Sequence, residues 1–270
     1  AGALWVARLE RRDALVPDWL IVSAIVLLAV VAVATPPKGS NDLWSYVMYG
    51  RVLSVHHANP WVQAPSRFAS DPFLARVSLG WRSTRSVYGP VFVSFAAVVA
   101  MVARSSALVA RLCIQGAMAG AVVGALLLIK RATRSNAAVL WLGLQPVVWM
   151  SGVNGGHNDS LVGLAVLGAA MLAHRRRATT VGIVLGLAAL TKLTALLALV
   201  GIAPWMLTVH GRTEARRVVV ACGAVVVAGI ALAPASIGVL LSSNHNVSRA
   251  STWNLLNTYL VPVHVRAHGG

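Results

Sequence analysis

Long apolar runs separated by short polar turns dominate the pattern of this chain. The runs lack the polar stripe of a soluble amphipathic helix, and several approach the ~20 residues that a helix needs to cross hydrocarbon. The ~10-residue alternation of a barrel strand does not occur, so only helices can satisfy the backbone within lipid. The pattern therefore predicts an all-α polytopic bundle of transmembrane helices. The apolar runs cover residues 19–35, 87–103, 108–129, 136–153, 161–173, 181–207 and 218–241.

The longest polar stretch, residues 36–86, follows the first apolar run. Three tryptophans are spread along it, and tryptophan favours the membrane–water interface. A connection of this length is usually functional. We therefore predict a long first external loop that contains short interfacial helices. The loop also carries two of the seven acidic residues of the chain, Asp42 and Asp71.

The domain organisation expected from this pattern is a single transmembrane domain over residues 1–270. Residues 1–18 form a cytoplasmic N-terminal segment, and residues 242–270 form a polar loop after the last run. The chain begins at Ala1 without a methionine and stops just after that loop, which predicts an incomplete, C-terminally truncated copy.

Charge supports a membrane location and sets an orientation. Only 11% of the residues are charged, against about 25% in soluble domains. The net charge of +16 lies in short clusters between apolar runs, as the positive-inside rule describes, and not on one face as in a nucleic-acid-binding protein. We expect a multi-pass plasma-membrane protein with lipid neighbours and no nucleic-acid partner. The clusters are Arg8/Arg11/Arg12, Lys130/Arg131/Arg134, Arg175/Arg176/Arg177 and Arg212/Arg216/Arg217.

Placing these clusters in the cytoplasm puts the 36–86 loop and the 154–160 turn outside, but leaves two segments to explain. Run 87–103 is short and opens with Gly89-Pro90, so we expect it to be tilted or partly inserted. Run 181–207 has basic clusters on both sides. A hairpin that bends near Lys192 would resolve this, because broken helices are tolerated where they are buried in protein or line a wet cavity.

The first candidate for chemistry is Asp42. Tyr46 and Tyr49 follow it at i+4 and i+7, so a helix would place all three on one face. Gly50 then allows another backbone to approach closely. Two interpretations stay open from spacing alone, because Asp42 is either a catalytic carboxylate or the cap of an interfacial helix.

The second candidate is the polar turn 154–160 between two apolar runs, in which Gly155 and Gly156 allow a compact bend. His157 and Asp159 could hold a phosphate or a metal, or orient a hydroxyl. The alternative is that Asp159 or Ser160 caps the following helix.

The third candidate is Lys192, which lies within an apolar run, far from either end. A buried ammonium needs an anion. That anion is either a carboxylate of the protein, Asp42 or Asp159, or the phosphate of a lipid carrier. The polar tail from Asn244 to Asn254 also offers hydrogen-bond donors, although an ordinary solvated loop explains it better.

These motifs resemble the first-loop region and the next two blocks of actinobacterial polyprenyl-phosphate-mannose-dependent α-1,6-mannopyranosyltransferases, which belong to the glycosyltransferase-C superfamily. The resemblance implies the fold of that superfamily, with ten or more spans, and matches Asp42 to its catalytic carboxylate. One departure is that Leu193 follows Lys192 where the family commonly has proline. The blocks are Asp42-x3-Tyr46-x3-Gly50-Arg51, Asn59-Pro60-Trp61, Asp71-Pro72, Tyr88-Gly89-Pro90, Gly155-Gly156-His157-Asn158-Asp159 and Gly186-Leu187-Ala188…Lys192.

The resemblance also implies a function: transfer of a mannosyl residue from a polyprenyl-phosphate donor to a glycolipid or polysaccharide acceptor by inverting displacement. A sugar phosphate has a good leaving group, so the acceptor needs only a base, here Asp42. No cofactor is expected, although a divalent cation between Asp42 and Asp159 stays open. The expected substrate-binding residues are Tyr46, Arg51, His157, Asn158, Asp159 and Lys192.

Two other classes compete with the enzyme. A transporter or flippase for a lipid-linked or small anionic substrate would also carry rare charges and broken helices, and a structural subunit would leave Asp42 and His157 unexplained. An enzyme needs Asp42, Asp159 and Lys192 beside one lateral cavity, whereas a transporter needs a path through the bundle.

Overall fold

The computed structural model describes residues 17–38 and 40–238, and the regular secondary structure in that part of the chain is helical. The expected N-terminal segment and the tail residues 242–270, including Asn244 to Asn254, lie almost entirely outside the described residues. The longer helices are α2 (Asp18–Ala34), α3 (Asp42–Ser54), α5 (Pro90–Ala103), α6 (Ala107–Thr133), α7 (Asn136–Gly143), α8 (Asp159–His174), α9 (Ala178–Ala189), α10 (Leu196–His210) and α11 (Arg212–Leu232). The shorter ones are η2 (Pro65–Arg67), η3 (Leu74–Arg76), α4 (Leu79–Arg82), η4 (Val148–Asn154) and η5 (Leu193–Ala195).

Within the described residues, three helical segments are long and apolar enough to cross a membrane: α6, Leu193–His210 and α11. The pair α7 and η4, bent by 66°, makes a fourth if it is counted as one span. Helices α2, α5, α8 and α9 are apolar but shorter. The prediction of an all-α membrane bundle is confirmed.

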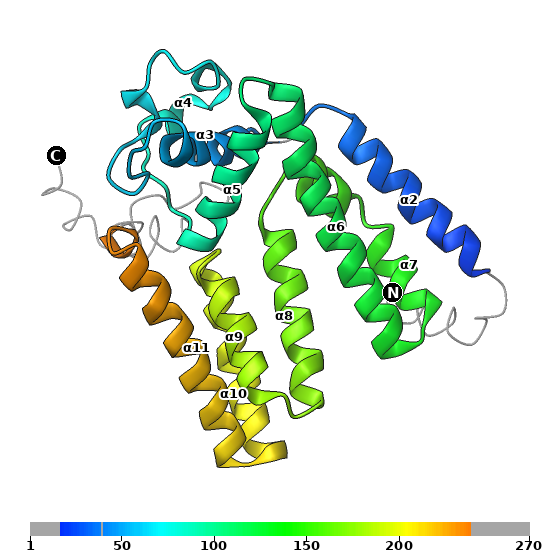
Figure 1. Cartoon of the computed structure of the whole chain (residues 1–270). Helices are drawn as coiled ribbons and strands as arrows, with labels where there is room; N and C mark the ends of the chain where they lie inside the picture. The colour runs from blue at the N-terminus through cyan, green and yellow to red at the C-terminus, as the bar shows by residue number, and fades with distance from the viewer. Residues whose placement is uncertain (1–16, 39, 239–270) are drawn as a thin grey trace, which may run out of the picture.

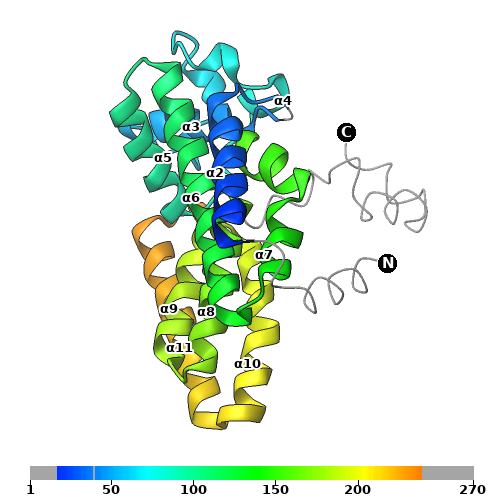
Figure 2. The same ribbon diagram turned by 90° about the vertical axis from the view of Figure 1, so that its right-hand side faces the viewer.

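The helices place the polar loop and the basic turns on opposite sides of the molecule. In Figure 1, α3 and α4 lie at the top, and the turns α6–α7, α8–α9 and α10–α11 point toward the bottom. Figure 2 shows the same division after a quarter turn. Those three turns contain or adjoin the basic clusters after Lys130, Arg175 and Arg212. The described clusters therefore share the side away from the 36–86 loop, as the orientation argument predicts.

Helix α5 is the expected short segment, since its 14 residues are fewer than the ~20 needed to span a bilayer. It packs on α3 through Gly50, where an added Cβ atom would lie 2.1 Å from the carbonyl oxygen of Ala96. The close backbone approach predicted at Gly50 is thus present. Tyr46, Tyr49 and Phe92 belong to the core of this end of the molecule.

The bend expected near Lys192 is also present. Helix α9 ends at Ala189, Lys192 is extended with φ −151°, and α10 then returns antiparallel to α9 (Figure 1). The tip is tied to the start of α5, where the Gly89 amide donates to the Thr191 carbonyl at 3.3 Å and the Val91 amide donates to the Leu190 carbonyl at 3.1 Å. The bend therefore forms with Leu193 in place of the family's proline.

Candidate active site

Asp42 lies at the exposed start of α3 and faces His157. Its carboxylate Oδ2 is 3.5 Å from His157 Nδ1, and about a quarter of each side chain is exposed (26% and 27%). Asp42 is the first residue of the helix, and the N-cap residue, Asn41, makes no side-chain capping hydrogen bond. The structure thus gives Asp42 a histidine partner in place of the capping role that its spacing allowed.

The turn from Asn154 to Asn158 places His157 beside Asp42. Gly156 has φ +70°, a conformation that favours glycine, and an added Cβ atom there would lie 3.1 Å from the Leu43 side chain. The bend predicted from the two glycines therefore packs directly on the first turn of α3.

Asn154 joins this turn to the end of α2, a role that the sequence did not reveal. Its Nδ2 group donates to the carbonyls of Ala32, Thr35 and Pro36 at 3.0–3.1 Å, and its Oδ1 accepts from the Lys38 amide at 3.0 Å. The last carbonyls of a helix have no partner within the helix. Asn154 supplies one, and so fixes the path from α2 into α3.

Lys192 forms an ion pair with Asp159. The Nζ–Oδ1 distance is 2.7 Å, and the side chains are 31% and 60% exposed. Of the anions left open for Lys192, the structure shows this carboxylate. Asp159 begins α8, and the preceding Asn158 makes no capping hydrogen bond. Because His157 and Asp159 come from the same turn, we call Asp42, His157, Asp159 and Lys192 the polar cluster.

Tyr46 and Asn158 lie beneath the polar cluster. Tyr46 is 1% exposed, and its hydroxyl accepts a hydrogen bond from the Tyr88 hydroxyl at 3.4 Å. Burial raises the pKa of Tyr46, and the charges of Asp42 and Asp159 add to the effect, so the phenol stays protonated. Asn158 is fully buried, and its side-chain amide atoms have no hydrogen-bond partner among the described residues.

Arg51 lies away from the polar cluster. It is nine residues after Asp42 on α3, about 13 Å along the axis at ~1.5 Å per residue. Its Nε is 2.8 Å from Asp71 Oδ2, its Nη1 donates to the Arg104 carbonyl, and its guanidinium lies over the Phe73 ring. The structure therefore uses Arg51 to hold the external loop against α3 and α5.

Asp71 is the centre of this second cluster, with a fully buried side chain. Burial by itself raises the pKa of Asp71. The Phe73 amide at 2.9 Å, His56 Nε2 at 2.7 Å and Arg51 outweigh that effect and hold the pKa below its ordinary value. Asp71 therefore stays ionised as an anchor of the loop.

A lateral groove of about 610 Å³ begins at the polar cluster and continues between α6, α7, η4 and α8. His157, Asp159 and Ser160 line its polar part. The remaining lining is almost entirely apolar: Val122, Ala125, Leu126, Ile129, Leu142, Val147, Val148, Gly152, Gly163 and Leu164, with Ser151.

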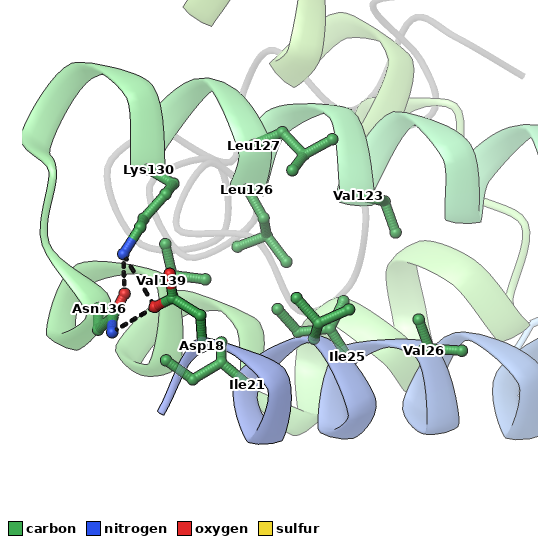
Figure 3. Close-up of a pocket in the computed structure, with 11 residues that line it drawn as sticks. Asp18, Ile21, Ile25, Val26, Val123, Leu126, Leu127, Lys130, Asn136 and Val139 are labelled. Carbon is green, nitrogen blue, oxygen red and sulfur yellow. Dashed lines mark hydrogen bonds and ion pairs between the residues drawn. The ribbon is translucent and has the colours of Figure 1, made fainter. Parts of the chain in front are cut away.

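A smaller pocket of about 200 Å³ lies between α2, α6 and α7, at the other end of α2. Figure 3 shows its polar edge, where Asp18 is 3.4 Å from Lys130 Nζ and 2.8 Å from Asn136 Nδ2. Asp18 and Ala34 are about 24 Å apart along α2 at ~1.5 Å per residue, so this pocket is remote from the polar cluster. Residues 17–38 and 40–238 contain no group of three potential metal-ligating side chains.

The fold and the site define a class: an integral membrane protein with a cluster of ionisable side chains at the polar end of an apolar lateral groove. Comparison with known proteins identifies a family within this class. A model of the α-(1→6)-mannopyranosyltransferase N-terminal domain matches residues 3–210, so the chain belongs to that family. The family expected from the motifs is confirmed.

One relative is the α-(1→6)-mannopyranosyltransferase A of Corynebacterium glutamicum, which is 28% identical over 186 residues. The match covers 67% of this chain and 37% of the relative, so the chain spans little more than a third of that protein. No solved structure matches.

Proposed function

We propose that this chain is the N-terminal part of a membrane mannosyltransferase. It would transfer a mannosyl residue from a polyprenyl-phosphate donor to a hydroxyl of a glycan or glycolipid acceptor. The family match and the name of the C. glutamicum relative, an α-(1→6)-mannopyranosyltransferase, support mannosyl transfer.

The observation that carries the choice of donor is the position of the polar cluster at one end of an apolar groove. A polyprenyl-phosphate sugar is polar at one end and apolar along the rest. Its phosphate suits His157 and its sugar hydroxyls suit Asp159, whose side chains are both partly exposed, and its prenyl chain suits the wall formed by α6, η4 and α8.

In the proposed reaction, Asp42 accepts the proton of the acceptor hydroxyl. That oxygen forms a bond to C1 of the mannosyl residue from the side opposite the phosphate. The C1–O bond breaks, and its electron pair leaves with the polyprenyl phosphate, which inverts the anomeric carbon. Asp42 suits this role because its carboxylate is partly exposed, with His157 beside it.

Positive charge beside the leaving phosphate comes from Lys192, with His157 as a hydrogen-bond donor. Lys192 is paired with Asp159 in this structure, so the phosphate would share or replace that carboxylate as its partner. Arg51 is left out of the phosphate site because its guanidinium already binds Asp71 and the Arg104 carbonyl.

The position of the groove favours the enzyme over a transporter. The groove runs along the sides of α6 and α8, where a lipid can enter from the bilayer. The polar cluster lies on the side away from the described basic turns (Figure 1), and by the positive-inside rule this supports an active site on the outer face of the plasma membrane.

The test uses the full-length gene product, radiolabelled polyprenyl-phosphate mannose and an oligomannoside acceptor. Asp42→Asn keeps the shape of the side chain and removes the base, so turnover should fall by about 10²–10⁴-fold. Asp18→Asn is the matched control, because Asp18, like Asp42, is the first residue of a helix and has a basic partner, here Lys130, but it lies at the remote end of α2. Undiminished turnover of Asp42→Asn removes Asp42 from the role, and a wild-type protein that uses no prenyl-phosphate sugar refutes the proposed donor.

A further inference from the structure

A basic pocket of about 490 Å³ lies between the first turn of α9 and the first half of α11, at the end of the molecule opposite the polar cluster (Figure 1). Its lining combines two hydroxyl side chains, two guanidinium groups and two apolar side chains. The residues that line it are Thr179, Thr213, Arg216, Arg217, Val220 and Ala221.

The packing of α9 on α11 explains why the pocket is there. The two helices touch at Gly182, where an added Cβ atom would lie 2.4 Å from the Val218 carbonyl oxygen. Thr179 lies about one helical turn before Gly182, and Thr213 lies more than one turn before Val218. The helices are therefore in backbone contact at Gly182, and the pocket extends from this contact, where Ala221 lines it, toward the α10–α11 turn, where Thr213 lines it.

The cations at this pocket are only partly neutralised. Arg217 pairs with Glu214 at 2.6 Å. Arg216 is exposed and has neither a hydrogen-bond partner nor an ion-pair partner among the described residues. Arg175, Arg177 and Arg212, at the neighbouring turns, are also exposed, and their guanidinium groups likewise have no such partner among the described residues.

We propose that this pocket binds the headgroup of an anionic phospholipid, with the phosphodiester on Arg216 and the hydroxyls of Thr179 and Thr213. Guanidinium binds phosphate oxygens well, and basic pockets between helices at a membrane surface hold anionic headgroups. The apolar side chains of Val220 and Ala221 suit the start of the acyl chains. A free phosphate ion would gain nothing from these apolar side chains. The site is independent of mannosyl transfer.

The competing explanation is that these arginines only set the orientation of the chain. Orientation depends on the number of basic residues near the ends of spans, and not on which of them faces a pocket. Arg216→Gln and Arg131→Gln remove the same charge from the same side of the molecule, and only Arg216 lines the pocket. The two variants therefore separate the explanations.

The test is native mass spectrometry of the purified chain in detergent, titrated with phosphatidylglycerol or phosphatidylcholine. The wild-type protein should prefer phosphatidylglycerol, and Arg216→Gln should weaken its binding by about five-fold, the equivalent of ~1 kcal/mol per basic residue at a membrane surface. Arg131→Gln and the charge-conserving Arg216→Lys should bind like wild type.

Equal losses of phosphatidylglycerol affinity in Arg216→Gln and Arg131→Gln would mean that the lipid is attracted by the overall basic charge of this side, and would overturn the site. The absence of any preference for phosphatidylglycerol would also overturn it. Displacement of the lipid by millimolar inorganic phosphate would assign the pocket to a free anion and overturn the lipid. Thermal unfolding of each variant without added lipid separates lost binding from lost folding.

Discussion

Replacing Gly89 by alanine is expected to move the tip of the α9–α10 hairpin and, with it, Lys192. The added Cβ atom would lie 2.1 Å from the carbonyl oxygen of Leu190 and 2.5 Å from its carbonyl carbon. The backbone of Gly89, with φ −72° and ψ 170°, accepts alanine without strain. The effect is therefore entirely one of space between two backbones.

The structure sets the size of the movement. Ordinary contact begins at 3.4 Å, so relief of a 2.1 Å contact requires a shift of about 1.3 Å. The Gly89–Thr191 and Val91–Leu190 hydrogen bonds must lengthen or break in that shift. Overpacking of this kind costs about 1–3 kcal/mol of stability. A misplacement of ~1 Å in a catalytic group costs about 10²-fold in rate.

The assay is mannosyl transfer by the full-length protein at saturating and subsaturating donor, with thermal unfolding in detergent measured in parallel. Gly89→Ala should lower kcat/KM by about 10²-fold. Gly80→Ala is the control, because Gly80 lies nine residues before Gly89, near the end of the external loop, and an added Cβ atom there meets nothing within 4 Å. That variant should retain wild-type activity and stability.

A double-variant cycle decides whether Gly89 acts through Lys192. If it does, Gly89→Ala combined with Lys192→Ala should be no slower than Lys192→Ala alone. If the double variant loses the product of the two single-variant losses in rate, Gly89 does not act through Lys192, and the positioning role is refuted. Full activity of Gly89→Ala would refute the close contact between Gly89 and Leu190 on which the prediction rests.

Two further predictions concern the loop anchor and the groove. Asp71→Asn leaves the buried charge of Arg51 without its ion-pair partner and should lower stability at neutral pH by about 3–5 kcal/mol, seen as a lower Tm. Since the folded-state pKa of Asp71 is lowered, wild type should lose this contribution as the pH falls below about 3.9, and Asp71→Asn should not. Gly163→Leu should raise the KM of a long-chain donor by about ten-fold but spare a short-chain donor, whereas Gly168→Leu, on α8 outside the groove, should change neither.

The features that could be predicted from sequence depend on local spacing or on composition. The apolar runs predicted the helices. The i, i+4, i+7 spacing predicted that Asp42, Tyr46 and Tyr49 lie on one face of a helix. Tyr46 and Tyr49 are both buried in that helix. The charge pattern predicted the bend at Lys192. Basic clusters at both ends of one apolar run can lie on the same side of the membrane only if the run turns back.

The features that could not be predicted depend on contacts with distant backbone atoms. Asn154 binds carbonyls at the end of α2, and Gly89 docks on the carbonyl of Leu190. A backbone carbonyl is present at every residue, so neither contact leaves a residue pattern. Arg51 and Asp71 were both visible in the motifs, but their pairing depends on the path of the chain between them.

The two aspartates of the external loop show how burial separates an anchor from a candidate base. Asp71 is fully buried, and its oxygens are engaged by Arg51, His56 and the Phe73 amide, so a hydroxyl cannot reach it. Asp42 is 26% exposed, and within the described residues its carboxylate forms an ion pair with His157 alone. A carboxylate that must accept a proton from a substrate needs free lone pairs at a surface. Of these two, only Asp42 has them, which agrees with the role proposed for it.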